Sequence, residues 1–520
     1  MIFNIKNKKM RVLLKIFGGG VYVVTLYYLA RLGLIGLNDT HKLRNIIPVF
    51  IVLFHLIPSQ KTFFYIVLPF SLLACIVTPI SLIYGDIDYQ ALISLIATNT
   101  IEAQEFIAQI PVKYFLQGIS IPVLAFFAFW VSQKIDIKPW RNKVGVLISI
   151  SILLFYLKPT NFFENLSSTY QTTSSNLSEL NQFVNQSAWN KINKVKTKKD
   201  YILIIGESAR RDYFSLYGYP IANTPFLNTV PGATIVDGLS AGGTYTIGSL
   251  TNMLTVGNKE NWQPRYQYNL IDLANEAGIK TYWLSNQGYT GQYDTPVSSI
   301  GNRASDIFFF NQGSYSDKNN SDFFLLQPFK EKLRQPSTGT RLFVLHTIGS
   351  HPDACRRIYD LKNPIKVNNT YYEYIACYVN SIRKTDIFIK EIYKTLQQNY
   401  KESNRDFSII YFSDHGLCHK EIDNKLIINN NSKSKFHYDI PLIKIDSNRT
   451  ERITQNCRKS GLNFTEGLAT WMGITGKALI KYDLFDGIDD PSDYGLCQHI
   501  DEIKQEPDPA VDLTGIVIKQ

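Results

Sequence analysis

Five apolar stretches dominate the first 157 residues of this 520-residue chain. They cover residues 15–37, 45–58, 62–84, 115–133 and 143–157. Apolar runs of about this length are typical of helices that cross a lipid bilayer. The second and fifth runs are short, so tilt or a neighbouring helix must make up the missing length. The sequence therefore predicts a transmembrane domain of five helices over residues 1–158.

Basic residues predict the orientation of these spans. Lysines and arginines precede the first span, and they recur between the fourth and fifth spans. Because basic loops stay on the cytoplasmic side, the N-terminus is predicted to lie inside. Five spans then place the chain after Lys158 outside, which in a diderm bacterium is the periplasm, with the anchor in the inner membrane. The first span shows no small-residue cleavage site and is interpreted as an anchor.

Cysteine usage agrees with a periplasmic location. Five of the six cysteines follow Lys158, where the redox conditions allow disulfides: Cys355, Cys377, Cys418, Cys457 and Cys497. Because five is an odd number, at least one of these thiols has no partner among the others.

Two features point to a membrane surface. The net charge of +10, without alternating basic and aromatic residues on a recognisable module, favours attraction to anionic lipid headgroups and no nucleic-acid partner. The polar connection between the third and fourth spans carries Asn99 and Glu102 on its outer side. This connection is either an ordinary solvated loop or a contact for a lipid headgroup.

Composition divides the rest of the chain in two. Residues 159–200 are rich in Ser, Asn, Thr and Gln, with scattered aromatic residues such as Trp189, and they predict an interfacial linker. Over residues 201–520 strands and helices alternate, which predicts an α/β domain with a mainly parallel sheet between helices. In its longest predicted helix, apolar residues recur at helical spacing from Ile375 to Leu396, and Lys384 is expected to face away from the sheet.

Three predicted strands are followed by side chains that can bind a metal. YILIIGE ends in Glu207, LHTIGSH carries His346 and His351, and YFSDHG carries Asp414 and His415. The C-terminal ends of parallel strands meet at one edge of a sheet, where open α/β sheets place their sites. Carboxylate and imidazole groups around an open position suit a divalent cation such as zinc. The sequence therefore predicts a metal site at this edge.

The segment SAGGTYTIGSL offers a nucleophile for such a site. Its Gly-Gly turn leads into a predicted helix near Tyr245 to Leu254, so Thr244 or Thr246 can point at the metal while backbone N–H groups hold a phosphate oxygen. Metal coordination lowers the pKa of a hydroxyl and makes attack feasible near neutral pH. Otherwise such a threonine is an ordinary helix N-cap.

Six motifs occur in order along the chain: YILIIGESARRDYFSLYGYPIANTP, GGTYTIGSL, NQGYTGQ, VLHTIGSH, YVNSIRKTD and YFSDHG. This set resembles the bacterial phosphoethanolamine transferases of the alkaline phosphatase and sulfatase superfamily, in particular a branch that reads DHGL after the last strand. The resemblance covers nearly the whole chain. It implies transfer of phosphoethanolamine from phosphatidylethanolamine to an envelope glycolipid or glycan, foremost lipid A or lipopolysaccharide core, through a phosphorylated threonine.

Position by position, the resemblance also implies the residues of the site. It implies that Glu207, Thr246, Asp414 and His415 bind zinc and that Thr246 is the nucleophile. It assigns to His351 a contact with the phosphoryl group or a second zinc ion. One zinc ion is expected, and a second stays open.

Further residues are implied as substrate contacts. His346 matches a second family histidine on the same strand, and Asn99 with Glu102 resembles the family's residues for lipid headgroups. The family histidine a dozen residues after DHG is missing, and either His419 or His437 can replace it. His437 is assigned to substrate binding.

Departures from the family pattern leave other possibilities open. Gly242 and Asn252 replace the cysteines that bracket the nucleophile loop in many members, and the resemblance leaves Cys355 with Cys377 as the expected disulfide. Alternatives are a phosphoglycerol transferase or lipid phosphodiesterase of the same fold, and a degenerate membrane sensor or scaffold. A monomer is expected.

Overall fold

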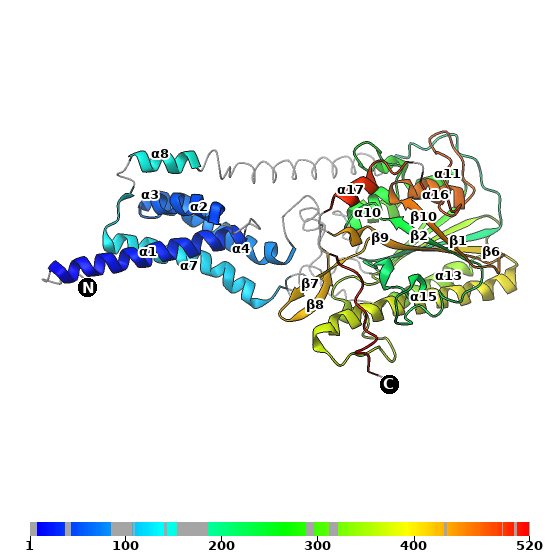
Figure 1. The fold of residues 1–520 in the computed structure, drawn as a ribbon. Coiled ribbons are helices and arrows are strands. Elements are labelled where there is room, and N and C mark those ends of the chain that lie inside the picture. Colours follow the sequence, from blue (N-terminus) through cyan, green and yellow to red (C-terminus); the bar gives the residue numbers. More distant parts are fainter. Residues whose placement is uncertain are drawn as a thin grey trace. The chain divides into compact units, whose positions relative to one another are not determined.

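The chain was analysed as a computed structural model. It describes residues 8–36, 43–84, 107, 110–139, 143–152, 186–287, 296–310, 321–430, 434–490, 492–503 and 507–518. These residues form two compact units, a helical one before residue 153 and an α/β one after residue 185 (Figure 1). Asn99 and Glu102 lie outside the described residues.

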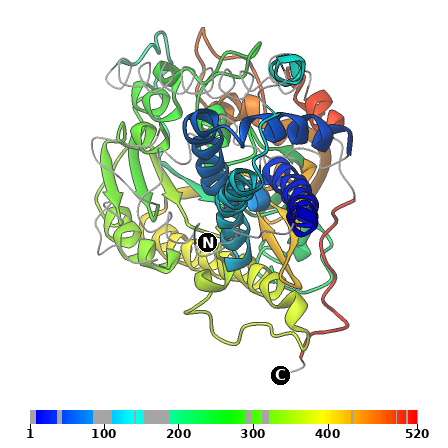
Figure 2. The same cartoon turned by 90° about the vertical axis from the view of Figure 1, so that its left-hand side faces the viewer.

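The helical unit contains three segments that are long and apolar enough to cross a membrane: Val12–Ile35, Gln60–Ile83 and Val112–Ile135. They belong to α1 (Lys8–Gly36), to α3, η1 and α4 (Gln60–Thr62, Phe63–Val67, Leu68–Tyr84), and to α7 (Val112–Ile135). Helices α1 and α7, which Figure 2 views nearly end-on, pack side by side. Three of the five predicted spans thus correspond to helices of spanning length.

The other two predicted spans are shorter helices. Helix α2 (Leu43–Leu56) has 14 residues, and at about 1.5 Å per residue it covers only about 21 Å of a hydrocarbon core about 30 Å thick. Helix α8 is described over Lys143–Ser151, and the rest of the fifth predicted span lies outside the described residues.

An eight-stranded sheet organises the α/β unit, in the order β10-β2-β9-β6-β1-β5-β3-β4. The central strand β1 (Lys199–Gly206) pairs in parallel with β5 (Arg341–His346) and β6 (Asp406–Ser413). Within the described sheet, only β9 (Asp439–Asp446) runs antiparallel to its neighbours. The remaining strands are β2 (Ala233–Ser240), β3 (Lys280–Ser285), β4 (Asp306–Phe309) and β10 (Ile453–Ser460). The predicted mainly parallel sheet is confirmed.

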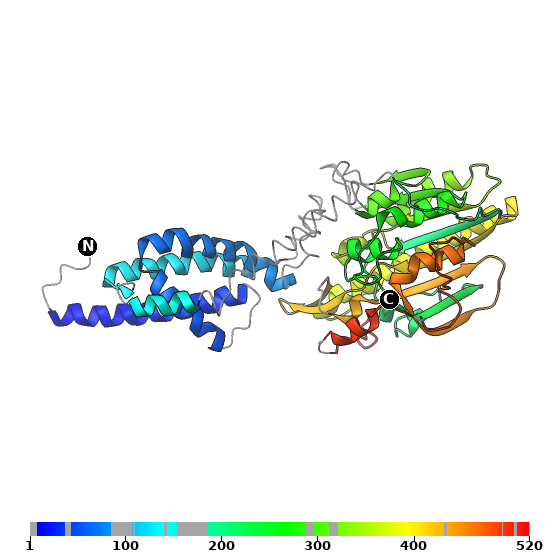
Figure 3. The ribbon, with the colours of Figure 1, turned by 90° about the horizontal axis from the view of Figure 1, so that it is seen from above.

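Helices cover both faces of this sheet because side chains alternate along each strand. On β1, Leu203 and Ile205 pack with α10 (Thr246–Met253), α11 (Leu270–Glu276) and α16 (Phe464–Trp471), whereas Ile202 and Ile204 pack with α13 (Leu326–Leu333) and α15 (Glu373–Ser403). Figure 3 looks onto the α16 side, with α15 behind the sheet. The chain therefore has a three-layer core that fixes the strand ends.

Shorter elements complete the unit. Three short helices are α12 (Pro296–Gly301), α14 (Ala354–Arg357) and α17 (Leu496–Glu502). A separate hairpin is formed by β7 (Cys418–Ile422) and β8 (Lys425–Asn429). The 3₁₀ turns are η4 (Arg211–Tyr213), η5 (Ser215–Tyr217), η6 (Tyr266–Tyr268), η8 (Asp322–Leu325), η9 (Thr370–Tyr372), η10 (Lys435–His437) and η11 (Gly461–Asn463). Figure 1 shows the hairpin extending beyond the main sheet.

Two expectations about side chains were wrong. Lys384 on α15 is buried instead of facing solvent, since its ammonium lies 2.5 Å from an Asp360 carboxylate oxygen and donates to the Arg357 carbonyl at 2.7 Å. Trp189, expected in an interfacial linker, packs in the core of the α/β unit, and its indole N–H donates to the Asn269 carbonyl at 2.9 Å.

The expected disulfide is present. Cys355 on α14 is bonded to Cys377 on α15, so the bond ties the turn after His351 to the long helix. Cys75, Cys418, Cys457 and Cys497 are free thiols.

Candidate active site

Two neighbouring strands deliver three buried side chains to the same edge of the sheet. Glu207 follows β1, and Asp414 with His415 follows β6, whose Ser413 pairs with Gly206. The exposed fractions of Glu207, Asp414 and His415 are only 1%, 0% and 1%. Parallel pairing of β1 with β6 thus brings Glu207 next to Asp414 and His415, which follow it by more than 200 residues in sequence.

Thr246 faces this cluster from the start of α10. Its hydroxyl oxygen lies 3.2 Å from each carboxylate oxygen of Glu207 and 3.4 Å from Nε2 of His415. Thr246 is the first helical residue and Tyr245 is the cap position, so Thr246 is not the ordinary N-cap. The Ser249 hydroxyl donates to the Asp414 carbonyl at 2.6 Å and thereby ties α10 to the end of β6.

Backbone contacts orient the ligand atoms toward one point. One Asp414 oxygen, Oδ1, accepts from the N–H groups of Ser208 at 2.9 Å and His415 at 2.7 Å. Nδ1 of His415 lies 2.7 Å from the Gly416 carbonyl, so it carries the proton and Nε2 presents its lone pair to the cluster. Among the described residues, Asp414 Oδ2 is buried and has no hydrogen-bond partner.

Burial and mutual repulsion disfavour the charged forms of the two carboxylates, and a bound divalent cation would relieve both effects. Burial and the neighbouring Asp414 raise the pKa of Glu207 to about 7, and burial raises the pKa of Asp414 to about 6. Burial also lowers the pKa of His415. One ligand atom from each residue lies within 4.8 Å of the others. Two buried carboxylates, one of them with an unpartnered oxygen, beside a neutral imidazole therefore fit a bound cation.

A loop after β5 brings His351 beside this cluster. Ser350 N–H donates to the Glu207 carbonyl at 2.9 Å, and the buried Asp322 accepts from the N–H groups of Ile348 at 2.8 Å and Gly349 at 3.0 Å. His351 is close enough to lower the pKa of Glu207 electrostatically. The loop thus holds a half-buried imidazole at the rim of the site.

The comparisons with known proteins agree with this geometry. Residues 199–474 match the Sulfatase family model. A Haemophilus influenzae protein named "Putative phosphoethanolamine transferase" is 44% identical over 373 residues, which are 70% of this chain and 76% of that protein. The chain belongs to the phosphoethanolamine transferases of the sulfatase family.

Two further relatives of this transferase extend the match. Phosphoethanolamine transferase OpgE of Escherichia coli is 29% identical over 441 residues, or 79% of this chain and 80% of that protein. The solved structure of lipooligosaccharide phosphoethanolamine transferase A (EptA) from Neisseria meningitidis covers 90% of this chain and 97% of its own, with a TM-score of 0.57 and 17% identity. The second likeness shows the fold, from the apolar helices to the sulfatase-like domain.

The other predicted histidines of the transferase lie around the cluster in different ways. His346, at the end of β5, is buried with its ring edge against Trp283, and its Nδ1 lies 3.2 Å from the Ser285 hydroxyl. His437 is buried, and burial, with a smaller effect of the nearby His415, lowers the pKa of His437 to about 3. His419 has both ring nitrogens engaged, by Asp508 and by Tyr213, so neither nitrogen is directed at the cluster.

Sequence reasoning missed two side chains that contact Glu207. The Gln287 amide donates to Glu207 Oε2 and to the Thr347 carbonyl, both at 2.9 Å. The Ser208 hydroxyl donates to Glu207 Oε1 at 2.7 Å, from a backbone with φ of +57°. Both residues lie in quoted motifs, NQGYTGQ and YILIIGES, which were the available signal.

Proposed function

We propose that this transferase moves phosphoethanolamine from phosphatidylethanolamine to a cell-envelope glycolipid or glycan, with lipid A or lipopolysaccharide core as the first candidates. The reaction passes through a phosphorylated Thr246. One observation carries this proposal: the Thr246 hydroxyl lies 3.2 Å from both oxygens of Glu207 and 3.4 Å from His415 Nε2. A half-buried hydroxyl among ligand-type side chains is suited to act as an activated nucleophile.

Zinc is the proposed cofactor. Glu207, Thr246, Asp414 and His415 would hold one zinc ion, and His437 would contact the substrate. A zinc ion held there would lower the pKa of the Thr246 hydroxyl and would neutralise charge on the non-bridging phosphate oxygens.

The residues of the chain then perform two displacements at phosphorus. In the first, Thr246 loses its proton to solvent and its oxygen attacks the phosphodiester, while His351 protonates the departing diacylglycerol oxygen. In the second, His351 takes the proton of the acceptor hydroxyl, and the acceptor oxygen attacks the phosphothreonine. Thr246 leaves and regains a proton from solvent, so both residues return to their starting states.

The anchor suits a lipid donor. In the part of the chain that the structure describes, three helices of membrane-spanning length precede the α/β unit, and we place them in the bacterial inner membrane with the catalytic unit in the periplasm. Asn99 and Glu102 contact the lipid headgroup in this proposal, and His346 supports substrate binding. The protein acts as a monomer.

Comparison of envelope lipids and glycans tests the function in cells. A strain that carries Thr246→Ala should lack an ethanolamine-phosphate mass increment that its parent shows on an envelope glycolipid or glycan. Thr229→Ala is the matched control, since its hydroxyl contacts only the nearby Pro225 and Phe226 carbonyls and lies on an exposed turn. A glycerol-phosphate increment would instead identify a phosphoglycerol transferase. Loss of lipid without any increment would identify a phosphodiesterase, and no difference between the strains would favour a sensor or scaffold.

A further inference from the structure

Residues 507–518 are fixed along the α/β unit by contacts with segments that are remote in sequence. Val511 N–H donates to the Tyr213 hydroxyl at 3.1 Å, and the Val511 carbonyl accepts from the Tyr219 hydroxyl at 2.8 Å. Leu513 is fully buried, and Val517 forms an antiparallel bridge with Val367. This segment, termed the strap below, therefore has a defined position on the catalytic unit.

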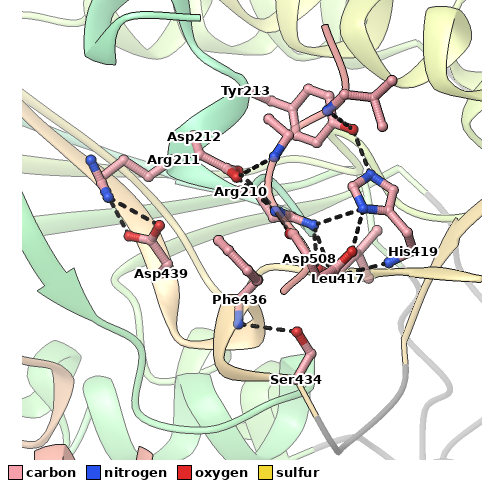
Figure 4. A network of polar contacts seen from close by, with 12 residues as sticks. Arg210, Arg211, Asp212, Tyr213, Leu417, His419, Ser434, Phe436, Asp439 and Asp508 are labelled. Atoms are coloured by element: carbon pink, nitrogen blue, oxygen red, sulfur yellow. Dashed lines mark hydrogen bonds and ion pairs between the residues drawn. The ribbon is translucent and has the colours of Figure 1, made fainter. Parts of the chain in front are cut away.

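Asp508 of the strap binds the side chain of Arg210, which is fully buried three residues after Glu207. One guanidinium nitrogen lies 3.3 Å from Asp508 Oδ2, and another donates to the Asp508 carbonyl at 2.6 Å (Figure 4). Asp212 binds the remaining side of the same guanidinium at 2.6 and 3.0 Å. Two carboxylates thus fix the plane of the Arg210 guanidinium.

His419 connects Asp508 to Tyr213. Nδ1 of His419 lies 2.5 Å from Asp508 Oδ1, and Nε2 lies 2.5 Å from the Tyr213 hydroxyl. A carboxylate can only accept, so the His419 Nδ1–H donates to Asp508, and Val511 N–H donates to the Tyr213 oxygen. Figure 4 shows Tyr213, His419 and Asp508 beside the Arg210 guanidinium. His419 is therefore part of the support of Asp508.

Arg210 in turn contacts the loop after His415. Its guanidinium lies 4.0 Å from the Phe436 ring centroid and 3.4 Å from the Leu417 carbonyl. A side chain at Gly416 would begin 3.0 Å from Arg210 Cγ and would collide with the Phe436 carbonyl, so Gly416 is held between the two.

The carbonyl of this confined glycine sets the orientation of His415, since it lies 2.7 Å from the imidazole Nδ1. The Gly416 N–H also donates to the His437 carbonyl at 2.8 Å. A continuous path of contacts therefore runs from Asp508 through Arg210 and Gly416 to His415.

We propose that Asp508 is a positioning residue for the active site: it fixes Arg210 against Gly416, and Gly416 orients the His415 imidazole. This role rests on the proposed function, because it requires His415 to bind zinc. Groups that orient ligating histidines typically change metal affinity by about 10–100-fold when they are removed. Because Asp508 acts through two intermediate contacts, we expect the lower end of that range.

The test compares Asp508→Asn with Asp512→Asn in the full-length protein in detergent. Asp512 is a matched control on the same strap, since it is exposed and accepts a hydrogen bond from Thr514 N–H. The first measurement is hydrogen exchange of the metal-free protein, read in peptides that cover residues 413–420 and 364–370. The second is the zinc dissociation constant, measured by competition with a chelator.

For Asp508→Asn we expect faster exchange over 413–420 and about tenfold weaker zinc binding, with unchanged exchange over 364–370, where the strap makes its Val367 bridge. Asp512→Asn should match the parent in exchange over 413–420, in exchange over 364–370 and in zinc affinity. If the Asp508→Asn protein exchanges like the control over 413–420, or binds zinc within twofold of it, Asp508 does not position the site. If the parent itself binds no zinc, the proposed function fails, and exchange over 413–420 alone decides the role of Asp508.

Discussion

Gly349 lies directly against the backbone of Glu207. A side chain at Gly349 would begin 2.9 Å from the Glu207 nitrogen and 3.0 Å from its carbonyl oxygen, and Gly349 has a φ of +45°. Only glycine meets both conditions without strain. This contact packs the loop that carries His351 directly against the backbone of Glu207.

Replacement of Gly349 by alanine is accordingly expected to impair turnover and stability together. The left-handed backbone alone costs a residue with a side chain about 1–3 kcal/mol, and the Cβ contact adds to that cost. Gly339→Ala is the control, since nothing lies within 4 Å of a side chain there. The melting temperature and the transfer rate should both fall for Gly349→Ala. Parental values for both would contradict the proposed packing.

Zinc is expected to stabilise the protein through Asp414. A ligand that binds only the folded state at 100 times its dissociation constant stabilises it by about 2.7 kcal/mol. Adding zinc to chelator-treated protein should therefore raise its melting temperature, and Asp414→Asn should remove that increase. The control is Asp386→Asn, because Asp386 is also buried but accepts from the Phe226 and Leu227 N–H groups outside the site. An equal zinc-dependent increase in both variants would exclude Asp414 as a ligand.

His351→Gln should slow transfer without preventing zinc from stabilising the fold. Loss of a general acid or base typically costs a factor of about 100 or more in turnover. His499→Gln tests for a general effect of histidine loss, since His499 is exposed on α17 and packs against Trp262. Steady-state rates with a phosphatidylethanolamine donor provide the measurement. Turnover above half the parental rate in His351→Gln would rule out the proposed proton transfer.

Local sequence pattern was enough to predict the strand ends that carry Glu207, Asp414 and His415. An apolar strand followed by a short polar loop has few alternative geometries in a parallel sheet, so its last residues face the same edge. Helical periodicity likewise predicted the buried face of α15 from Ile375 to Leu396. These features depend on neighbours in sequence or on a repeating pattern.

Contacts between remote segments could not be predicted in this way. The burial of Lys384 depends on Asp360, 24 residues earlier, in a loop without periodicity. The environment of His419 depends on Tyr213 and Asp508, which lie 206 and 89 residues away. Periodicity contains no information about such pairs, because only the assembled sheet brings them together.

The central claim is that Thr246 carries phosphoethanolamine during turnover, and intact-protein and peptide mass spectrometry test it most directly. Full-length protein is incubated with zinc and phosphatidylethanolamine without an acceptor, and Thr246→Ala is treated identically. We predict one phosphoethanolamine increment per chain, located on the peptide that contains Thr246 and absent from Thr246→Ala. An increment on another residue, or none on a protein that consumes the donor lipid, would contradict the claim.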